Sequence, residues 1–433
     1  MESLINKAYL LKSYASSIRQ DLHKYPETGF LEYRTSSFVI KTLLSLGYDV
    51  KYGKEVMDGS YILNLPEKER QEKCIQRSIL EGADINLVNN MKDGMTGIVA
   101  TIDTNKKGNT IAFRFDMDAN DVSETINTNH IPNIKNFSSK HKDTMHACGH
   151  DGHVAIGLSL AKLVIENIDK FSGKIKLIFQ PAEEGVRGAN SMVNAGVVDD
   201  VNYFFSGHIG IKAKNNDTLV CFTSNFLATS RYEVDFKGVS SHAALAPEKG
   251  KNALLAAASA TLSLHTLAQH GQGVARVNVG VLSGGSGHNI VADTAKLVFQ
   301  TRGETNIINQ DIENKALQVI EGAAKMYDVA VNYKKIGYAS AIDFDSSFSK
   351  ELKTYFNKIN IYNNIVENEK MDASEDCTLF MKKVLENKGK AAYMMFGSKI
   401  INEHHNSMFD FDESVLVKAI AIYACLAYTY SKI

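Results

Sequence analysis

The sequence predicts an α/β fold: a central mixed sheet flanked by helices, interrupted by a smaller ferredoxin-like α+β domain. The chain has 433 residues, about three times the usual domain size, so more than one domain is expected. Strand-like runs alternate with helical apolar spacing, and the pattern changes at residue 227 and again at residue 342. We therefore expect a first domain of residues 1–226 and 342–433, and a second of residues 227–341.

Strand-like runs in the first domain are short and rich in β-branched and aromatic residues. They are Gly97–Asp103, Thr110–Met117, Lys174–Phe179 and Asn202–Ser206. Between the second and third of them, Val154–Asn167 has the apolar spacing of a helix. Open α/β sheets bind ligands beyond the carboxyl ends of their strands, so polar residues that follow these runs are the candidates for function.

The second domain is expected to have the element order β-α-β-β-α-β, which is that of a ferredoxin-like unit. The predicted elements are a strand Arg231–Lys237, a helix Asn252–Ala268, strands Arg276–Leu282 and Ala295–Arg302, a helix ending near Lys325, and a strand Val329–Lys335. The chain would then cross between the two domains twice.

Composition excludes several classes of protein. The net charge of -1 provides no field that would attract nucleic acid or anionic lipid. The N-terminal stretch lacks the apolar core of a secretory signal, and the apolar run Ala419–Tyr430 is too short to span a bilayer, so a buried closing helix is expected. Five scattered cysteines without a Cys-x-x-Cys pair fit a reducing compartment. We expect a cytoplasmic protein that acts on a small molecule and binds neither nucleic acid nor membrane.

The stretch MHACGHDGH places Cys148 and His150 two positions apart, in a loop before the predicted helix. Thiolate and imidazole are good ligands for zinc and similar metals. Taken alone, the motif fits equally well a capping turn with one packed thiol. A third interpretation makes Cys148 a nucleophile with a neighbouring histidine as its base.

Three further motifs favour a metal site. QPAEEG follows a strand directly and offers Glu183 and Glu184, which alone would indicate only a solvated turn. Beside a metal, one glutamate can be a ligand while the other takes the proton of a water. His208 ends the next strand, and His405 is the second of two adjacent histidines that precede NSMFDFDE. A metal centre accounts for more of these residues than a Cys-His nucleophile does.

Polar groups elsewhere have supporting roles in this interpretation. Asp116 and Asp118 share one face at the end of a strand, where they are expected to orient a histidine ligand. In the second domain, the SSHA and GGSGHN loops and Arg302 are polar groups at loops or strand ends. The guanidinium fork of arginine suits a carboxylate.

The motifs MHACGHDGH, QPAEEG, GHIG, SSHA and HHNSMFDFDE occur in this order. In this combination the sequence resembles the metallopeptidase family of aminoacylases, carboxypeptidases and auxin-conjugate amidohydrolases. The likeness covers nearly the whole chain, including GFLEYRT, AFRFDMDA and ASEDCTLFM. It implies a catalytic domain with a pair of metals at the carboxyl edge of its sheet, interrupted by a lid domain through which subunits dimerise.

Carried over by motif, the resemblance assigns roles to individual residues. Two divalent ions per subunit, zinc or manganese, are expected, with Glu183 as the general base and no metal bound by His404. The implied metal ligands are Cys148, His150, Glu184, His208 and His405. The implied substrate-binding residues are His242, Asn289 and Arg302. His288 stands where related sequences have an arginine, so a lower affinity for a substrate carboxylate is expected at this position.

The resemblance also implies an activity. We expect a metal-dependent hydrolase of N-aroyl or N-acyl amino acids, with p-aminobenzoyl-glutamate first among the substrates. Aminoacylase, dipeptidase or auxin-conjugate amidohydrolase activity is the alternative within the family. The expected assembly is a homodimer, or a heterodimer with a homologous subunit on which activity depends.

Overall fold

The computed structural model describes residues 1–343 and 345–432, which divide into two compact units. Unit 1 contains residues 1–224, 345–370 and 379–432, and unit 2 contains Asn225–Asp343 and Met371–Thr378. The chain therefore leaves unit 1 and returns to it twice. The function of unit 2 as a lid or dimerisation domain stays a prediction.

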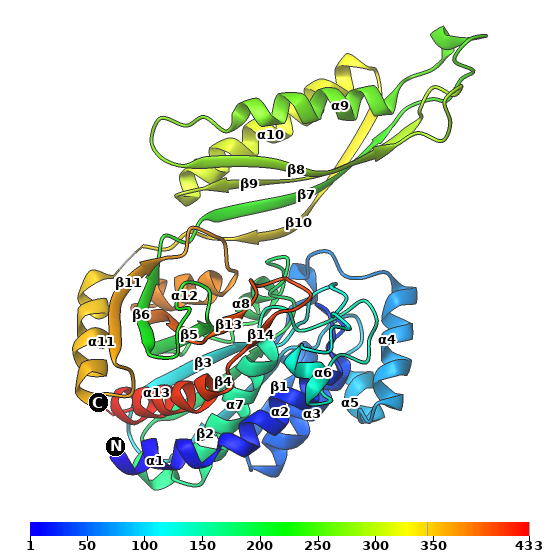
Figure 1. Ribbon diagram of the computed structural model, residues 1–433. Helices are drawn as coiled ribbons and strands as arrows, with labels where there is room; N and C mark the ends of the chain where they lie inside the picture. Colours follow the sequence, from blue (N-terminus) through cyan, green and yellow to red (C-terminus); the bar gives the residue numbers. More distant parts are fainter. Residues whose placement is uncertain (344, 433) are drawn as a thin grey trace. The chain divides into compact units, whose positions relative to one another are not determined.

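Unit 1 is built on an eight-stranded mixed sheet (Figure 1). Its strands are β1 (Asp49–Tyr52), β2 (Ile98–Asp103), β3 (Thr110–Asp116), β4 (Lys174–Gln180), β5 (Tyr203–Ile209), β6 (Thr218–Ser224), β11 (Asn364–Lys370) and β12 (Lys390–Phe396). Their order is β1-β2-β4-β3-β5-β12-β6-β11. The four central strands β4, β3, β5 and β12 are parallel, while β2 and β6 flank them in antiparallel orientation. This mixed sheet confirms the predicted fold class.

Helices cover both faces of this sheet. They are α1 (Glu2–Leu10), α2 (Lys12–Lys24), α3 (Tyr33–Ser45), α4 (Lys68–Leu80), α5 (Ile85–Asn90), α6 (Ile131–Ile134), α7 (His150–Ile165), α8 (Ala189–Asn194), α11 (Ser346–Ile359), α12 (Cys377–Glu386) and α13 (Ser414–Tyr430). Neighbouring residues of β5 point to opposite faces. Phe204 stacks on Phe380 of α12, whereas Phe205 stacks on Phe113, which in turn contacts Tyr423 of α13.

The predicted closing helix is confirmed as α13, whose apolar residues are almost all buried. In the parts of the chain that the structure describes, no helix combines the length and the apolar character needed to cross a membrane.

Helix α7 begins at His150, four residues before the predicted start. Gly149 adopts φ +91° immediately before it, a left-handed conformation that glycine accepts readily. This turn carries the chain from the MHAC loop straight into the helix. His150 and His153 therefore lie in its first turn, three residues apart, and share a face of the helix.

Unit 2 contains a four-stranded antiparallel sheet with the order β10-β7-β9-β8. Its elements are β7 (Ala228–Lys237), α9 (Ala253–Leu264), β8 (Ala275–Gly284), β9 (Thr294–Gly303), α10 (Asn306–Met326) and β10 (Ala330–Ala339). This is the predicted β-α-β-β-α-β order. Leu297 and Phe299 of β9 join the core beneath α9 and α10, so Val298, Gln300 and Arg302 lie on the opposite, open face.

Candidate metal centre

The parallel strands bring the predicted motifs to one edge of the unit 1 sheet. Strands β3, β4 and β5 are parallel and Asp116 pairs in register with Gln180, so their carboxyl ends meet. The QPAEEG loop follows β4, His208 lies near the end of β5, and α7 begins at this edge with His150. Polar side chains from distant parts of the sequence thus reach one place.

Cys148, His150 and His208 form the first group of potential metal ligands. One donor atom from each lies within 4.8 Å of the other two. The Cys148 sulphur is 3.3 Å from Nε2 of His208. All three side chains are buried.

Cys148, Glu184 and His405 form a second group that meets the same distance criterion. Nε2 of His405 lies 3.1 Å from a carboxylate oxygen of Glu184. The backbone of His405 has φ +65°, and its N–H donates to the carbonyl of Ala147 at 2.7 Å, so this turn is tied to the MHAC loop. Cys148 belongs to both groups.

The tautomers of the buried histidines suit metal binding. Nδ1–H of His150 donates to the main-chain carbonyl of Asp118 at 2.8 Å, and Nδ1–H of His208 donates to the carbonyl of Ile209 at 2.8 Å. A carbonyl only accepts, so in the neutral form of each ring the proton is on Nδ1 and the lone pair is on Nε2. Nε2 of His150 is buried and, among the described residues, has no hydrogen-bond partner. An unsatisfied lone pair at this depth fits a cation, so the residues present fit a metal.

The pKa shifts indicate how the donors are protonated without a cation. Burial, aided by the charge of His153, lowers the pKa of His208 well below its usual value, which keeps the imidazole neutral. Burial and the charge of Glu184 raise the pKa of the Cys148 thiol. Contacts with Cys148 and Glu184 raise the pKa of His405 to about 10. Binding of a cation to such a set releases protons.

Asp118 fixes the backbone of the two adjacent glutamates. Its carboxylate accepts the N–H of Glu183 at one oxygen and the N–H of Glu184 at the other, both at 2.9 Å. Carboxylate oxygens of both glutamates approach His150 to within the distance that defines the metal groups. Asp118 is buried and also accepts from His150 through its main-chain carbonyl, so this one residue positions His150, Glu183 and Glu184.

Of the two aspartates expected to orient a histidine ligand, Asp118 lies against a proposed ligand and Asp116 against a different histidine. Nδ1 of His150 is 2.8 Å from the main-chain carbonyl of Asp118 and 3.6 Å from an oxygen of its carboxylate. The Asp116 carboxylate instead accepts from Nδ1 of His153 at 2.5 Å and from Arg114 at 2.7 Å. Nε2 of His153 accepts the N–H of Ile209 at 3.0 Å. The one sequence signal for this role of His153 is its spacing of three residues from His150.

His404 lies close to the centre but, among the described residues, in none of the groups of potential ligands. Its Nε2 donates to the carbonyl of Ile209 at 3.2 Å, and its ring packs 4.8 Å from the ring of Phe409.

The predicted substrate-binding residues all lie in unit 2. His242 and Asn289 are exposed and occupy neighbouring segments, because Ala243 N–H donates to the carbonyl of Asn289 at 3.0 Å. Nδ1 of His242 accepts N–H groups of the turn that follows, which leaves Nε2 as the outer atom. Arg302 lies on the open face of the sheet.

Two further arginines lie beside Arg302. Arg276 of β8 is directly opposite Arg302 in the antiparallel register, and Arg231 of β7 pairs with Gln300, two residues along β9. Burial lowers the pKa of Arg302, and the charges of Arg231 and Arg276 lower it further. Three guanidinium groups therefore gather on the open face, an arrangement that suits an anion.

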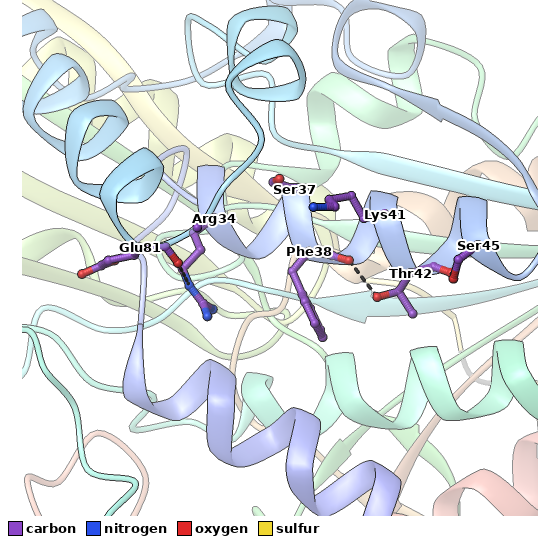
Figure 2. Close-up of a pocket in the computed structure, with 8 residues that line it drawn as sticks. Arg34, Ser37, Phe38, Lys41, Thr42, Ser45 and Glu81 are labelled. Atoms are coloured by element: carbon purple, nitrogen blue, oxygen red, sulfur yellow. Dashed lines mark hydrogen bonds between the residues drawn. The ribbon is translucent and has the colours of Figure 1, made fainter.

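A surface pocket of about 290 Å³ lies apart from these residues, along α3 and the turn after α4 (Figure 2). Two of its polar side chains have local partners: Arg34 pairs with Asp21 at 2.9 Å, and Thr42 donates to the carbonyl of Phe38 at 2.8 Å. None of the predicted site residues lines it.

Known proteins resemble this chain over almost its full length. The A subunit of p-aminobenzoyl-glutamate hydrolase from Escherichia coli (strain K12) is 43% identical over 431 residues, which cover 99% of each chain. Indole-3-acetyl-aspartic acid hydrolase of Enterobacter agglomerans is 43% identical over 413 residues, 95% of this chain and 94% of that one. The crystal structure of the aminobenzoyl-glutamate utilization protein from Klebsiella pneumoniae gives a TM-score of 0.83, with 37% identity and 98% coverage of both chains. Residues 112–429 match peptidase family M20/M25/M40, and the chain belongs to that family.

Proposed function

We propose that this protein is a metal-dependent amide hydrolase that cleaves p-aminobenzoyl-glutamate into p-aminobenzoate and glutamate. The observation that carries the proposal is the pair of ligand groups that share Cys148, with the Glu183 carboxylate beside them. Relatives at 43% identity are named for hydrolysis of amide conjugates of glutamate and aspartate.

The proposed ligands of two divalent ions are Cys148, His150, Glu184, His208 and His405. Because Cys148 belongs to both groups, its thiolate would help to hold either ion. Imidazole and thiolate favour zinc, while carboxylates and hydrolytic chemistry suit manganese as well. When bound, such ions polarise the amide carbonyl and lower the pKa of water.

Glu183 is the proposed general base. Its carboxylate takes one proton from the attacking water, whose oxygen forms the new bond to the carbonyl carbon. The same carboxylate then delivers that proton to the amide nitrogen as the C–N bond breaks, so the products are a carboxylic acid and an amine. Asp118 holds Glu183 in place through the backbone. His242 would donate from Nε2 to the oxygen that gains negative charge.

Arg302 is proposed to bind a free carboxylate of the substrate, with Asn289 as a second polar contact. The neighbouring guanidinium groups of Arg231 and Arg276 favour an acidic amino acid over a neutral one, because an acidic amino acid brings two carboxylates. A glutamate conjugate and an aspartate conjugate both meet this requirement. Indole-3-acetyl-aspartate is therefore the second candidate substrate, favoured by a relative of equal identity.

The proposed assembly is a dimer, of two copies or with a homologous subunit. Strand β8 lies at the edge of the unit 2 sheet, where its backbone can pair with another chain. Val281 and Leu282 on this strand are 45% and 43% exposed, and Leu262 of α9 is 75% exposed. An edge strand beside exposed apolar side chains is typical of an interface. A 43% identical relative is named as a subunit.

Assay of the purified chain, loaded with zinc or manganese, tests the activity. The substrates are p-aminobenzoyl-glutamate, indole-3-acetyl-aspartate, N-acetyl amino acids and dipeptides. The highest kcat/KM is expected for the aroyl-glutamate, and a negligible rate on it would overturn the substrate assignment. Gel filtration of the same sample separates the two assemblies: a metal-loaded homodimer that is inactive until a homologous subunit is added would identify the heterodimer.

The variant Glu183→Ala tests the general base. Turnover should be abolished while the metal content stays near that of the wild type, because Glu183 is not among the proposed ligands. A variant that hydrolyses at a near-normal rate would show that another group takes the proton.

A further inference from the structure

The stretch Glu27–Thr35, which follows α2 and includes the first three residues of α3, has no role in the function proposed above, although it is buried along most of its length. We refer to it as the clamp segment. The carbonyl of Glu27 accepts the N–H of Ala119 at 2.8 Å, and Thr28 forms a parallel bridge with Ala119. Ala119 directly follows Asp118, so the clamp segment lies against the loop that positions the proposed general base.

Glu32 connects the clamp segment to the QPAEEG loop. Its side chain is fully buried. One carboxyl oxygen accepts the N–H of Ala182 at 2.9 Å, and the other accepts the hydroxyl of Thr96 at 2.7 Å. Asp118 accepts the next two N–H groups along the chain, those of Glu183 and Glu184. Three successive amides of this loop are therefore each bound by a buried acidic side chain.

The loop needs such support because its backbone is strained. Ala182 has φ +51°, a left-handed conformation that is unfavourable for a residue with a Cβ atom. Gly29 of the clamp segment allows the two segments to approach closely: a Cβ atom there would lie 2.9 Å from both Cα and Cβ of Ala182. The conformation that precedes Glu183 is thus held by contacts from outside the loop.

We infer that Glu32 is a positioning residue for Glu183: its hydrogen bond to the Ala182 amide fixes the backbone from which the general base projects. The inference rests on the proposed function, because it takes Glu183 as the base. Burial raises the pKa of Glu32 to about 8, with the charge of Asp118 adding to the effect. When protonated, the carboxyl group resembles the amide of glutamine: one oxygen still accepts the N–H of Ala182, while its O–H can donate to the hydroxyl oxygen of Thr96.

Three variants of the metal-loaded protein test the inference. Glu32→Ala removes the acceptor, and kcat should fall about 10- to 100-fold, as expected for slight misplacement of a catalytic group, with little change in KM or metal content. Glu32→Gln restores an acceptor for Ala182 and should retain most of the wild-type kcat. Glu27→Ala is the matched control, since the Glu27 carboxylate is equally buried and accepts the N–H groups of Arg34 and Thr35, which lie within the clamp segment. It should lower the thermal midpoint without lowering kcat.

The outcomes separate this inference from the proposed function. A wild-type kcat in Glu32→Ala would overturn the positioning role, as would a loss in Glu32→Gln equal to that in Glu32→Ala. If Glu32→Ala does not fold, Glu32→Asp, which is one methylene shorter, takes its place in the comparison. A wild-type protein that hydrolyses no amide refutes the proposed function instead. In that case a crystal structure of Glu32→Ala decides the inference: displaced backbone at Ala182–Glu184 supports it, and an unchanged loop refutes it.

Discussion

Replacement of Asp118 by asparagine should damage catalysis more than substrate binding. The carboxylate of Asp118 accepts two backbone N–H groups, those of Glu183 and Glu184, at 2.9 Å each. Asparagine keeps one acceptor oxygen and places an NH₂ group where the second oxygen was. One of these two partly buried N–H groups then faces another donor and loses its partner.

The magnitude follows from these contacts. A buried N–H left without an acceptor costs about 1–3 kcal/mol. Because these N–H groups are only partly buried, the free energy of unfolding should fall by about 1 kcal/mol, the lower end of that range. Displacement of Glu183 by a fraction of an ångström should lower kcat about 10- to 100-fold. KM should change little, because the proposed carboxylate-binding residues belong to unit 2 rather than to this loop.

Steady-state kinetics on p-aminobenzoyl-glutamate and urea unfolding measure the two effects. Asp121→Asn is the control, because Asp121 is exposed and forms only a surface ion pair with Arg70 at 2.7 Å, which contributes at most about 1 kcal/mol. Equal kcat values for the two variants would refute the positioning role of the Asp118 carboxylate.

Three other outcomes are expected. Dialysis against a chelator should abolish hydrolysis, and Cys148→Ser should lose both ions, since Cys148 belongs to both groups; metal analysis that finds two ions retained would contradict this. Arg302→Gln should raise KM for p-aminobenzoyl-glutamate with less effect on kcat, as expected for lost ground-state binding, and an unchanged KM would exclude the contact. Burial would raise the pKa of Glu124, but hydrogen bonds from His130 and His23 lower it from 4.5 to about 2. Its carboxylate therefore stabilises the fold fully above pH 4.5, and this contribution, on the order of 3 kcal/mol, is lost as the pH falls to 2; unfolding midpoints over that range should depend less on pH in Glu124→Gln.

The strands that can be predicted from sequence are those with a clear pattern. Strands β3 and β4 have β-branched and aromatic residues, and their predicted ends lie within one residue of the observed ones. Strand β12 is not predicted because it is buried on both faces, so its sequence KAAYMMF lacks alternation and is rich in residues that favour helices. Strand β11 at the sheet edge is not predicted because NIVENEK has the composition of a polar segment.

In the candidate site, too, some features can be predicted from the sequence and others cannot. Glu184 and His208 can be identified because each belongs to a short motif at the end of a parallel strand, and parallel strands bring such ends together. Cys148 and His405 lie in loops and His150 begins a helix, and their motifs are identified through the family resemblance. The hydrogen bond from the Ala182 amide to Glu32 cannot be predicted from the sequence. It joins positions 150 residues apart, and its donor is a backbone N–H, which every non-proline residue has. The proximity of Arg276 to Arg302 likewise depends on the register of β8 and β9.

Titration of the metal-free protein with zinc or manganese, followed by release of p-aminobenzoate from p-aminobenzoyl-glutamate, tests the central claim most directly. The proposed two-metal hydrolase predicts no release without metal and a rate that rises to a plateau at two equivalents per chain. A chain that carries two ions and releases no p-aminobenzoate, alone or with a homologous subunit, would contradict it.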